Sequence, residues 1–236
     1  MGIDLKKHFD KVYVVNLDSR PDKWRAFKDR AKKAGVVGFD RFRAVDGSLC
    51  NPPAWYSFHG ANMNGAWGCL MSHFMIAYDA MLSGADTYLV LEDDACFSSD
   101  FKERLPDVLA ETNKLKNGWD MLYLGGQHLY KETRSPDKIE GTDLLKCVNV
   151  NRTHAFAVHS RFMLKFSQHI MHAPDYIDHR YYHNFLRHVD HQLGELHDHM
   201  QTIAPINWLC GQAEGSSDVN GQEKPQEWWH GKGWGK

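Results

Sequence analysis

The chain has 236 residues, of which 42% are hydrophobic and 25% are charged, and these values are sufficient for one large α/β domain with its own core. Its net charge of −2 at pH 7 argues against a uniformly basic surface that binds nucleic acid or anionic membranes without specificity. Five widely spaced cysteines without a C-x-x-C pair argue against a disulfide framework or a zinc knuckle and favour a reducing compartment, the cytoplasm. No run approaches the roughly 18 apolar residues of a transmembrane helix, so no membrane span is expected.

The first elements of the chain follow a strand, helix, strand order. Residues 11–17 are almost uniformly apolar, which predicts a strand buried on both faces. Ser19 is the expected N-cap of a helix that has Pro21 in its first turn and ends at Gly35. Residues 39–44 predict a second strand. This order is typical of the start of a parallel sheet.

A loop and a long helix follow. Residues 48–64 place Pro, Gly and Asn between aromatic residues, which either pack the loop down or stack on a base or a sugar ring. Residues 65–82 carry apolar side chains at spacings of three and four, which predicts a helix. Ser72 and His73 lie on this helix, where a single histidine serves either as a hydrogen-bonding core residue or as part of a site.

The stretch that says most about chemistry is residues 88–94, where four apolar residues run into Glu92, Asp93 and Asp94. The apolar run predicts a buried strand, and open α/β sheets bind their ligands at the carboxyl ends of such strands. Three adjacent carboxylates repel one another unless a cation neutralises them, and their hard oxygen ligands suit Mg²⁺ or Mn²⁺. The alternative is that Asp93 and Asp94 cap a following helix.

The second half of the chain predicts more elements of the same kind. We expect a helix capped at 98–100 that runs to 115, a strand at 119–124, a polar flap or hairpin at 130–142, paired strands at 144–150 and 155–159, a helix at 161–172 and a last apolar segment at 203–209. The strand at 119–124 should end on the same rim as the acidic residues.

Histidines are frequent between residues 169 and 199. The spacing His179-x-x-x-His183 is compatible with two imidazoles on one helical face, but the His-Glu-x-x-His arrangement of a zinc hydrolase is missing. Solvated histidines are therefore favoured over a zinc hydrolase. Asp190, in the same region, lies on a predicted helix that can face the rim.

The C-terminal tail, about residues 221–236, is rich in Trp and Gly and follows a Gly/Ser-rich loop that carries Asp218. The tail fits either a flexible lid with sugar-stacking aromatic residues or a segment held in a groove. The chain has no internal repeat and no clear linker, so we expect a single domain over residues 1–236.

Four separate stretches, taken together, resemble one family: residues 12–22, 44–47, 65–73 and 89–94. In order and spacing they are similar to glycosyltransferase family 25, the group of the bacterial lipooligosaccharide glycosyltransferases and the collagen galactosyltransferases. Residues 153–156 and 217–218 resemble later blocks of the family, so the resemblance covers about residues 11–220. It implies a GT-A fold with a Rossmann-like, mostly parallel central sheet flanked by helices. It also implies a nucleotide-sugar donor, a divalent metal (Mn²⁺ or Mg²⁺) and inversion at the anomeric carbon.

The resemblance also implies roles for residues at the end of the strand that closes at 94. Glu92-x-Asp94 resembles the Asp-x-Asp pair of GT-A enzymes. Asp94 would then be a metal ligand, and Glu92 would contact the metal or the donor ribose, with Asp93 beside them at the donor. A bound cation of this kind takes up the charge of a nucleoside diphosphate as it leaves.

The remaining implied roles lie on other elements. The resemblance assigns nucleotide binding to Asn16 and Arg20, and the wall of the donor or acceptor pocket to Ser72 and His73. Asp190 matches an acidic position ahead of the last strand of the family and would be the base that takes the proton of the acceptor hydroxyl. His154 and Asp218 are candidates for a further donor or metal contact, and Asp218 is equally compatible with a plain turn residue.

The acceptor stays open at this point. The resemblance implies a nucleotide-sugar donor, for which we expect a UDP-sugar, and an acceptor hydroxyl on a glycan such as lipooligosaccharide, on a protein, or on a hydroxylated base of modified DNA. The DNA alternative requires a local basic groove, for which the candidates are Lys23, Lys28, Arg30, Lys32 and Lys33. An inactive module that binds a nucleotide or a carbohydrate is the alternative from another class.

Overall fold

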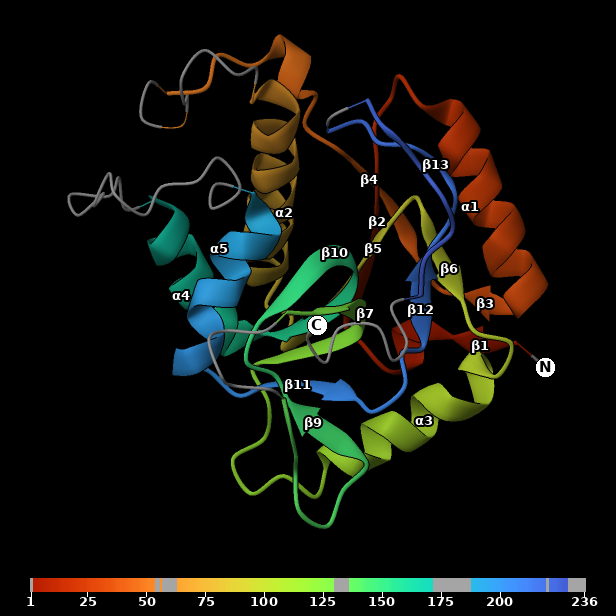
Figure 1. Ribbon diagram of the computed structural model, residues 1–236, viewed down its shortest axis with the longest axis vertical. Helices are drawn as coiled ribbons and strands as arrows, with labels where there is room; N and C mark the ends of the chain where they lie inside the picture. The colour runs from red at the N-terminus through yellow and green to blue at the C-terminus, as the bar shows by residue number, and fades with distance from the viewer. Residues whose placement is uncertain are drawn as a thin grey trace.

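A sheet of eight strands forms the centre of the structure, which is a computed structural model that describes residues 2–53, 56, 63–129, 136–171, 188–219 and 221–228 (Figure 1). In the order in which they lie side by side, its strands are β4 (Asp40–Arg43), β2 (Lys11–Asn16), β5 (Thr87–Glu92), β10 (Val150–His159), β7 (Met121–His128), β11 (Thr202–Pro205), β9 (Leu144–Lys146) and β8 (Asp137–Lys138).

Most strands of this sheet point the same way. β2 pairs in parallel with β4 and β5, and β7 pairs in parallel with β11. β10 lies between β5 and β7 and is antiparallel to both, so β5 and β7 share a direction. β9 also runs against its neighbours β11 and β8. The expected mostly parallel sheet is confirmed, with β10 and β9 as its reversed members.

Helices cover both faces of the sheet. α2 (Asn64–Leu82), α4 (Ser160–Met171) and α5 (Val189–Leu196) lie over one face, and α1 (Pro21–Ala34) and α3 (Phe101–Thr112) lie over the other (Figure 1). Tyr88 and Val90 of β5 join the core under the first group, and Leu89 and Leu91 join the core under the second. Because successive side chains of a strand point to opposite faces, burial on both faces explains why this strand is apolar at every core position.

Short elements complete the chain. They are β1 (Ile3–Asp4), η1 (Leu5–Lys7), β3 (Val36–Val37), η2 (Gly47–Leu49), β6 (Ala95–Phe97), η5 (His197–His199), β12 (Cys210–Gln212), β13 (Gly215–Ser216) and β14 (Glu223–Lys224). β12 pairs with β6, and β13 pairs with β14. Among the helices described, none has the length and apolar character that a bilayer crossing requires.

The polar residues 151–154 do not separate two strands, so the predicted pair at 144–150 and 155–159 is wrong. They lie within β10, which pairs with β5 and β7, while residues 144–146 form β9 and pair with β11. The register of β10 against β7 shifts between Asn151 and Ala155, and Arg152 has a φ of 79°. A local bulge therefore carries the polar run through the sheet without ending the strand.

One expected helix cap is wrong, and the alternative in which Asp93 and Asp94 cap a helix is excluded. The N-cap of α1 is Arg20, one residue after Ser19, and it makes no side-chain capping bond; Pro21 supplies the first turn. Asp93 and Asp94 do not cap a helix, because the next residues form β6, whose backbone pairs with β12.

Candidate functional site

A cavity of about 920 Å³ opens at the rim where β2 and β5 end. The predicted site residues that line it are Asn16, Ser72, His73, Glu92, Asp93, Asp94, Asp190 and Asp218. They come from β2, α2, β5, α5 and the segment after β13, so the fold brings together side chains that are up to two hundred residues apart in the chain. Arg20 and His154 are not part of its wall.

Glu92, the last residue of β5, is held by its neighbours in an ionised state. Its Oε1 accepts a hydrogen bond of 2.6 Å from the Thr153 hydroxyl and lies 3.2 Å from Nε2 of His73. Burial acts to raise the pKa of Glu92, but the hydrogen bond and charge of His73, with Thr153, outweigh it and lower the pKa to about 2. Glu92 therefore presents a negative charge to the cavity.

Asp94, two residues later, is in the opposite electrostatic condition. Its Oδ2 accepts a hydrogen bond of 2.7 Å from Nε2 of Gln212, while its buried Oδ1 has no hydrogen-bond partner among the described residues. Burial and then the charge of Glu92 raise the pKa of Asp94 to about 7. A cation between these two carboxylates would satisfy the orphan oxygen and offset the repulsion.

The side chain of Asp93 points towards Asn16, at the carboxyl end of β2. Its Oδ2 accepts a bond of 2.6 Å from Nδ2 of Asn16, and the Asn16 oxygen accepts a bond of 2.8 Å from Nε of Arg41. Burial raises the pKa of Asp93 to about 6, although the bond from Asn16 acts in the opposite direction. Asn16 is only 1% exposed and Asp93 9%, so this pair joins the ends of β2 and β5 and leaves little of either side chain for a ligand.

Ser72 shapes the cavity wall through the backbone. Its hydroxyl donates to the Gly68 carbonyl at 2.7 Å and accepts from the Val45 amide at 2.8 Å, which ties the segment after β4 to α2. The approach is close enough that a Cβ on Gly68 would lie 2.6 Å from the Val45 oxygen and from the Gly47 nitrogen. Glycine is therefore required at this position for the cavity to have its present wall.

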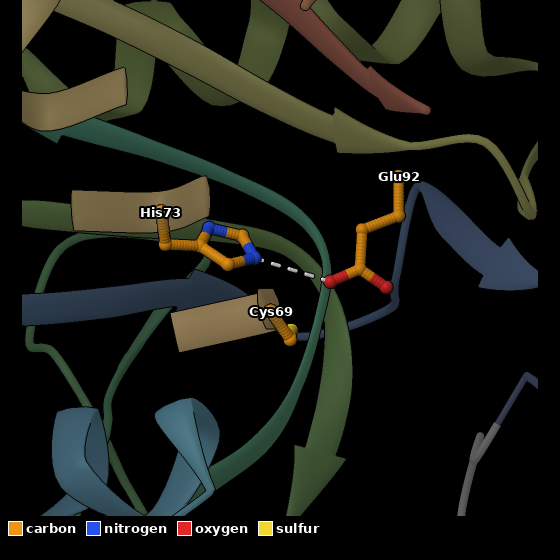
Figure 2. Close-up of side chains that lie close together, drawn as sticks. All are labelled: Cys69, His73 and Glu92. Atoms are coloured by element: carbon orange, nitrogen blue, oxygen red, sulfur yellow. Dashed lines mark hydrogen bonds and ion pairs between the residues drawn. The ribbon is translucent and has the colours of Figure 1, made fainter. Parts of the chain in front are cut away.

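His73, Cys69 and Glu92 meet at one spot of the wall (Figure 2). Cys69 and His73 are four residues apart on α2, and one potential ligand atom from each of the three residues lies within 4.8 Å of the others. The His73 ring stacks on Phe156 with centroids 5.4 Å apart. Cys69 was not predicted as a site residue, and its i, i+4 spacing from His73 is the sequence signal that could have indicated it.

Asp190 faces the cavity from the first turn of α5 and is held by two backbone amides. Its Oδ2 accepts from the Arg152 amide at 3.2 Å and its Oδ1 from the His191 amide at 3.0 Å. Arg152, which also lines the cavity, has the left-handed backbone noted above. The contact therefore fixes Asp190 against the bulge of β10. Arg152, like Gln212 and Lys224, is a cavity residue that the sequence did not indicate, and Lys23 was indicated only as a candidate for a basic groove.

Asp218 is engaged by two cations. One oxygen pairs with Arg20 and the other lies 2.5 Å from Nζ of Lys23, both from the start of α1. Arg20 also pairs with Asp22 at 2.9 Å. These contacts join the segment after β13 to α1 across the rim, and they favour a structural clasp over a metal contact for Asp218.

His154 lies in β10 beneath the cavity. It is completely buried, and a Cβ on Gly125 of β7 would lie 2.5 Å from its Nε2. Burial lowers the pKa of His154 to about 4, so the ring is neutral at neutral pH.

The described part of the tail is pinned. β14 pairs with β13, Gln212 and Glu227 form a backbone bridge, and the ring of Trp228 lies where a Cβ on Gly211 would be 2.7 Å away. The sequence fitted either a flexible lid or a segment held in place, and up to residue 228 the tail is held in place. Trp229 and Trp234 lie outside the described residues. Tyr56, from the aromatic loop, is likewise buried and packs on Trp67 at 4.8 Å between centroids.

The histidines between 169 and 199 form no metal cluster in the part of the chain that the structure describes, where Cys69, His73 and Glu92 are the one group of three potential ligands. His169 lies 3.2 Å from Glu195, and His197 lies 3.3 Å from the Tyr123 hydroxyl. His172, His179 and His183 lie outside the described residues.

Comparison with known proteins identifies the family. Residues 9–198 match the family described as glycosyltransferase family 25 (LPS biosynthesis protein). This chain belongs to glycosyltransferase family 25. The resemblance seen in its sequence is thus confirmed, and the carboxylate-lined cavity lies at the rim of a family 25 fold.

Family 25 relatives include proteins with different names. Procollagen galactosyltransferase 1 of Danio rerio is 29% identical over 140 residues, which are 54% of this chain and 23% of that protein. Inactive glycosyltransferase 25 family member 3 of Homo sapiens is 29% identical over 137 residues, 52% of this chain and 23% of that protein. The chain therefore matches about a quarter of the length of these relatives. The crystal structure of A197 from STIV covers 92% of this chain and 93% of its own at 10% identity, with a TM-score of 0.45.

Proposed function

We propose that this chain catalyses metal-dependent, inverting transfer of a sugar from a nucleotide-sugar donor, a UDP-sugar, to an acceptor hydroxyl. One observation carries the proposal: the cavity at the ends of β2 and β5 has the carboxylates of Glu92, Asp94 and Asp190 on its wall. Family membership supports sugar transfer in general, and the residues of this cavity support the finer assignment.

Glu92 and Asp94 fit a hard divalent cation. Glu92 is ionised, and Asp94 has a buried oxygen without a hydrogen-bond partner among the described residues. Mn²⁺ and Mg²⁺ prefer oxygen ligands and commonly use one or two carboxylates together with substrate phosphates. When bound, such a cation supplies charge neutralisation for the leaving diphosphate.

The cavity also has positively charged groups, which a diphosphate requires. Arg152 and Lys224 line it, as does the first turn of α2, which contains no acidic residue. A helix N-terminus carries a partial positive charge and unsatisfied amides, which favour phosphate groups. These groups would bind the donor on the side of the cavity that Glu92 and Asp94 flank.

Asp190 is the proposed base. In an inverting reaction the acceptor oxygen attacks the anomeric carbon as the bond to the diphosphate breaks, and the hydroxyl proton passes to a carboxylate. The amides of Arg152 and His191 fix the orientation of Asp190 at the cavity wall. Asp190 lies on α5, an element separate from β5, which carries the other carboxylates. The product then carries the inverted anomeric configuration.

A donor screen tests the proposal. The purified chain is incubated with a panel of nucleotide sugars and Mn²⁺, and release of nucleoside diphosphate is measured, because transfer to water needs no knowledge of the acceptor. We expect Mn²⁺-dependent release from one donor class and its loss in Asp94→Asn. Asp107→Asn, an exposed carboxylate on α3, is the matched control and should retain release. Titration of UDP with and without Mn²⁺ identifies the alternative, an inactive module, by binding without turnover.

A glycan, such as a lipooligosaccharide, is the proposed acceptor, and the cytoplasm the proposed location. The DNA alternative has less support, because two of the five basic residues named for a groove act inside the fold. Lys23 pairs with Asp218, and Arg30 donates to the backbone oxygens of Asp93 and Ala95 at 2.5 and 3.0 Å. A protein hydroxyl stays the alternative acceptor that the name of the procollagen relative suggests.

A further inference from the structure

Cys69, His73 and Glu92 form a group whose chemistry differs from that of the other cavity carboxylates (Figure 2). Two members come from successive turns of α2 and the third from the end of β5, so the group joins two rigid elements. The potential ligand atoms lie within 4.8 Å of one another. Modest closure would bring them to the roughly 2.0–2.3 Å metal–ligand distances of a zinc site.

The ring of His73 is held with its Nε2 towards Glu92 (Figure 2). The side chain is 2% exposed, its Nδ1 is buried without a hydrogen-bond partner among the described residues, and its Nε2 points at Glu92. Stacking on Phe156 fixes the plane of the ring. Cys69 is partly exposed, so an ion can reach its sulfur from the cavity.

From these contacts we infer that Cys69, His73 and Glu92 form a binding site for a thiophilic divalent cation, with Zn²⁺ as the natural case, and that its occupation inhibits the enzyme. Sulfur and imidazole ligands select zinc over Mn²⁺ and Mg²⁺, which prefer oxygen. Three protein ligands leave a fourth position for water, as in open zinc sites. The site is separate from the histidines at 169–199.

Inhibition follows from the shared ligand. The proposed function assigns Glu92 to the metal that accompanies the donor, and zinc held by Cys69 and His73 would occupy the same carboxylate. On binding, the Cys69 thiol loses its proton to solvent and becomes a thiolate. Nε2 of His73, which faces Glu92, gives up its proton so that its lone pair can bind the ion, and Glu92 binds as a carboxylate. The inhibitory step rests on the proposed function, whereas the binding step does not.

Alkylation of the two partly exposed cysteines tests binding in the unmodified chain. Cys50 and Cys69 are partly exposed, while Cys96, Cys147 and Cys210 are buried. The reduced, metal-free protein is treated with iodoacetamide with and without zinc chloride, and each cysteine is quantified by mass spectrometry. We expect one equivalent of Zn²⁺ to slow modification of Cys69 at least tenfold, and Cys50, outside the cavity wall, to react at an unchanged rate. Equal rates at Cys69 with and without zinc would overturn the site.

Cobalt spectroscopy tests the ligand set. Titration with cobalt chloride should produce a thiolate-to-cobalt absorption band that saturates at one equivalent and persists in excess Mn²⁺. The band should vanish in Cys69→Ser and persist in Cys50→Ser. His73→Gln removes a ligand and should weaken binding by more than the roughly 10-fold that the loss of a residue hydrogen-bonded to a ligand costs. Circular dichroism of each variant verifies folding. A band that survives in folded Cys69→Ser would refute the assignment.

Donor hydrolysis separates this inference from the proposed function. If zinc binds as described and inhibits Mn²⁺-dependent release, both hold. If zinc binds but no donor is hydrolysed under any condition, the site stands and the proposed function fails. If release is Mn²⁺-dependent but Cys69 is never protected, the function stands and the zinc site is wrong.

Discussion

The end of β5 and the start of β10 lie at the same rim. The polar run Glu92–Asp94 follows the apolar residues of β5, and the polar run Asn151–His154 precedes the apolar residues of β10. At Glu92–Asp94 the chain leaves the sheet, and the three carboxylates diverge: Glu92 towards His73, Asp93 towards Asn16 and Asp94 towards Gln212. At Asn151–His154 the chain stays within β10, because Asn151 pairs with Gln127 of β7 and the strand continues from Ala155 onward between β5 and β7.

The difference shows two ways of placing polar groups at a binding rim. A strand that ends delivers side chains in a turn, where each can face a different neighbour. A strand that continues must bend instead. Here the bend lies at Arg152, which has a left-handed backbone and whose amide donates a hydrogen bond to Asp190. The first arrangement concentrates charge, and the second positions a carboxylate from another element.

The largest expected effect tests the second arrangement. Asp190→Asn should lower kcat by about 10²- to 10⁴-fold, because the amide cannot take the acceptor proton, although its oxygen can still accept one backbone amide. Steady-state kinetics with the donor found in the screen measures the change. Glu195→Gln, an exposed carboxylate on the same helix, is the control and should retain kcat. An Asp190→Asn enzyme with kcat close to that of the parent would remove Asp190 as the base.

Substitution within the β5 triplet comes next in size. Glu92→Gln should lower turnover by about 10²- to 10³-fold, because it removes an ionised group from the metal site and weakens the contact with His73. Asp93→Asn should have a much smaller effect, because that carboxylate faces Asn16. Comparison of turnover and of Mn²⁺ affinity in the two variants checks this ranking. Equal losses would mean that the three carboxylates act as one group.

The pH dependence of the free energy of unfolding tests the burial of His154 in β10. Burial lowers the pKa of His154 to about 4, against 6.5 for an unperturbed histidine. Between these values the unfolded state binds a proton that the folded state does not, so this contribution to stability is complete above pH 6.5 and is lost as the pH falls towards 4. Between pH 6.5 and 5 the loss should be about 2 kcal/mol.

Urea unfolding of His154→Gln measures that loss. The variant should show a smaller decrease in the free energy of unfolding over the same pH range, whatever its stability at pH 7. His128, whose pKa burial also lowers to about 4, remains in both proteins and cancels in the comparison. Parallel pH curves for the two proteins would contradict a neutral, buried His154.

The smallest effect concerns the bend itself. Arg152→Gly should be more stable than Arg152→Ala by about 1 kcal/mol, because only glycine adopts a φ near 79° without a steric cost. Both variants lose the same side chain, so their difference in urea unfolding reports the backbone alone. If alanine proves as stable as glycine, β10 does not carry the bend in solution.

Local patterns in the sequence determined much of the architecture. Uniform apolar runs at 11–17 and 119–124 and the spacing of three and four at 65–82 predicted β2, β7 and α2, because burial on two faces or along one stripe leaves a periodic signal. The acidic residues after β5 indicated the rim of the site for the same reason: strand ends are where a parallel sheet leaves side chains free.

Tertiary contacts decided what local patterns do not record. Nothing in residues 151–154 reveals that β7 pairs with the strand at Asn151 and that β5 and β7 flank it from Ala155 onward, so the sequence pattern predicts a break. Cys69 joins the cavity only because α2 crosses the end of β5, and Asp218 meets Arg20 and Lys23 only because β13 and β14 return to α1. Chain pairing and long-range packing depend on residues far apart in sequence, and their consequences exist only once the sheet has been assembled.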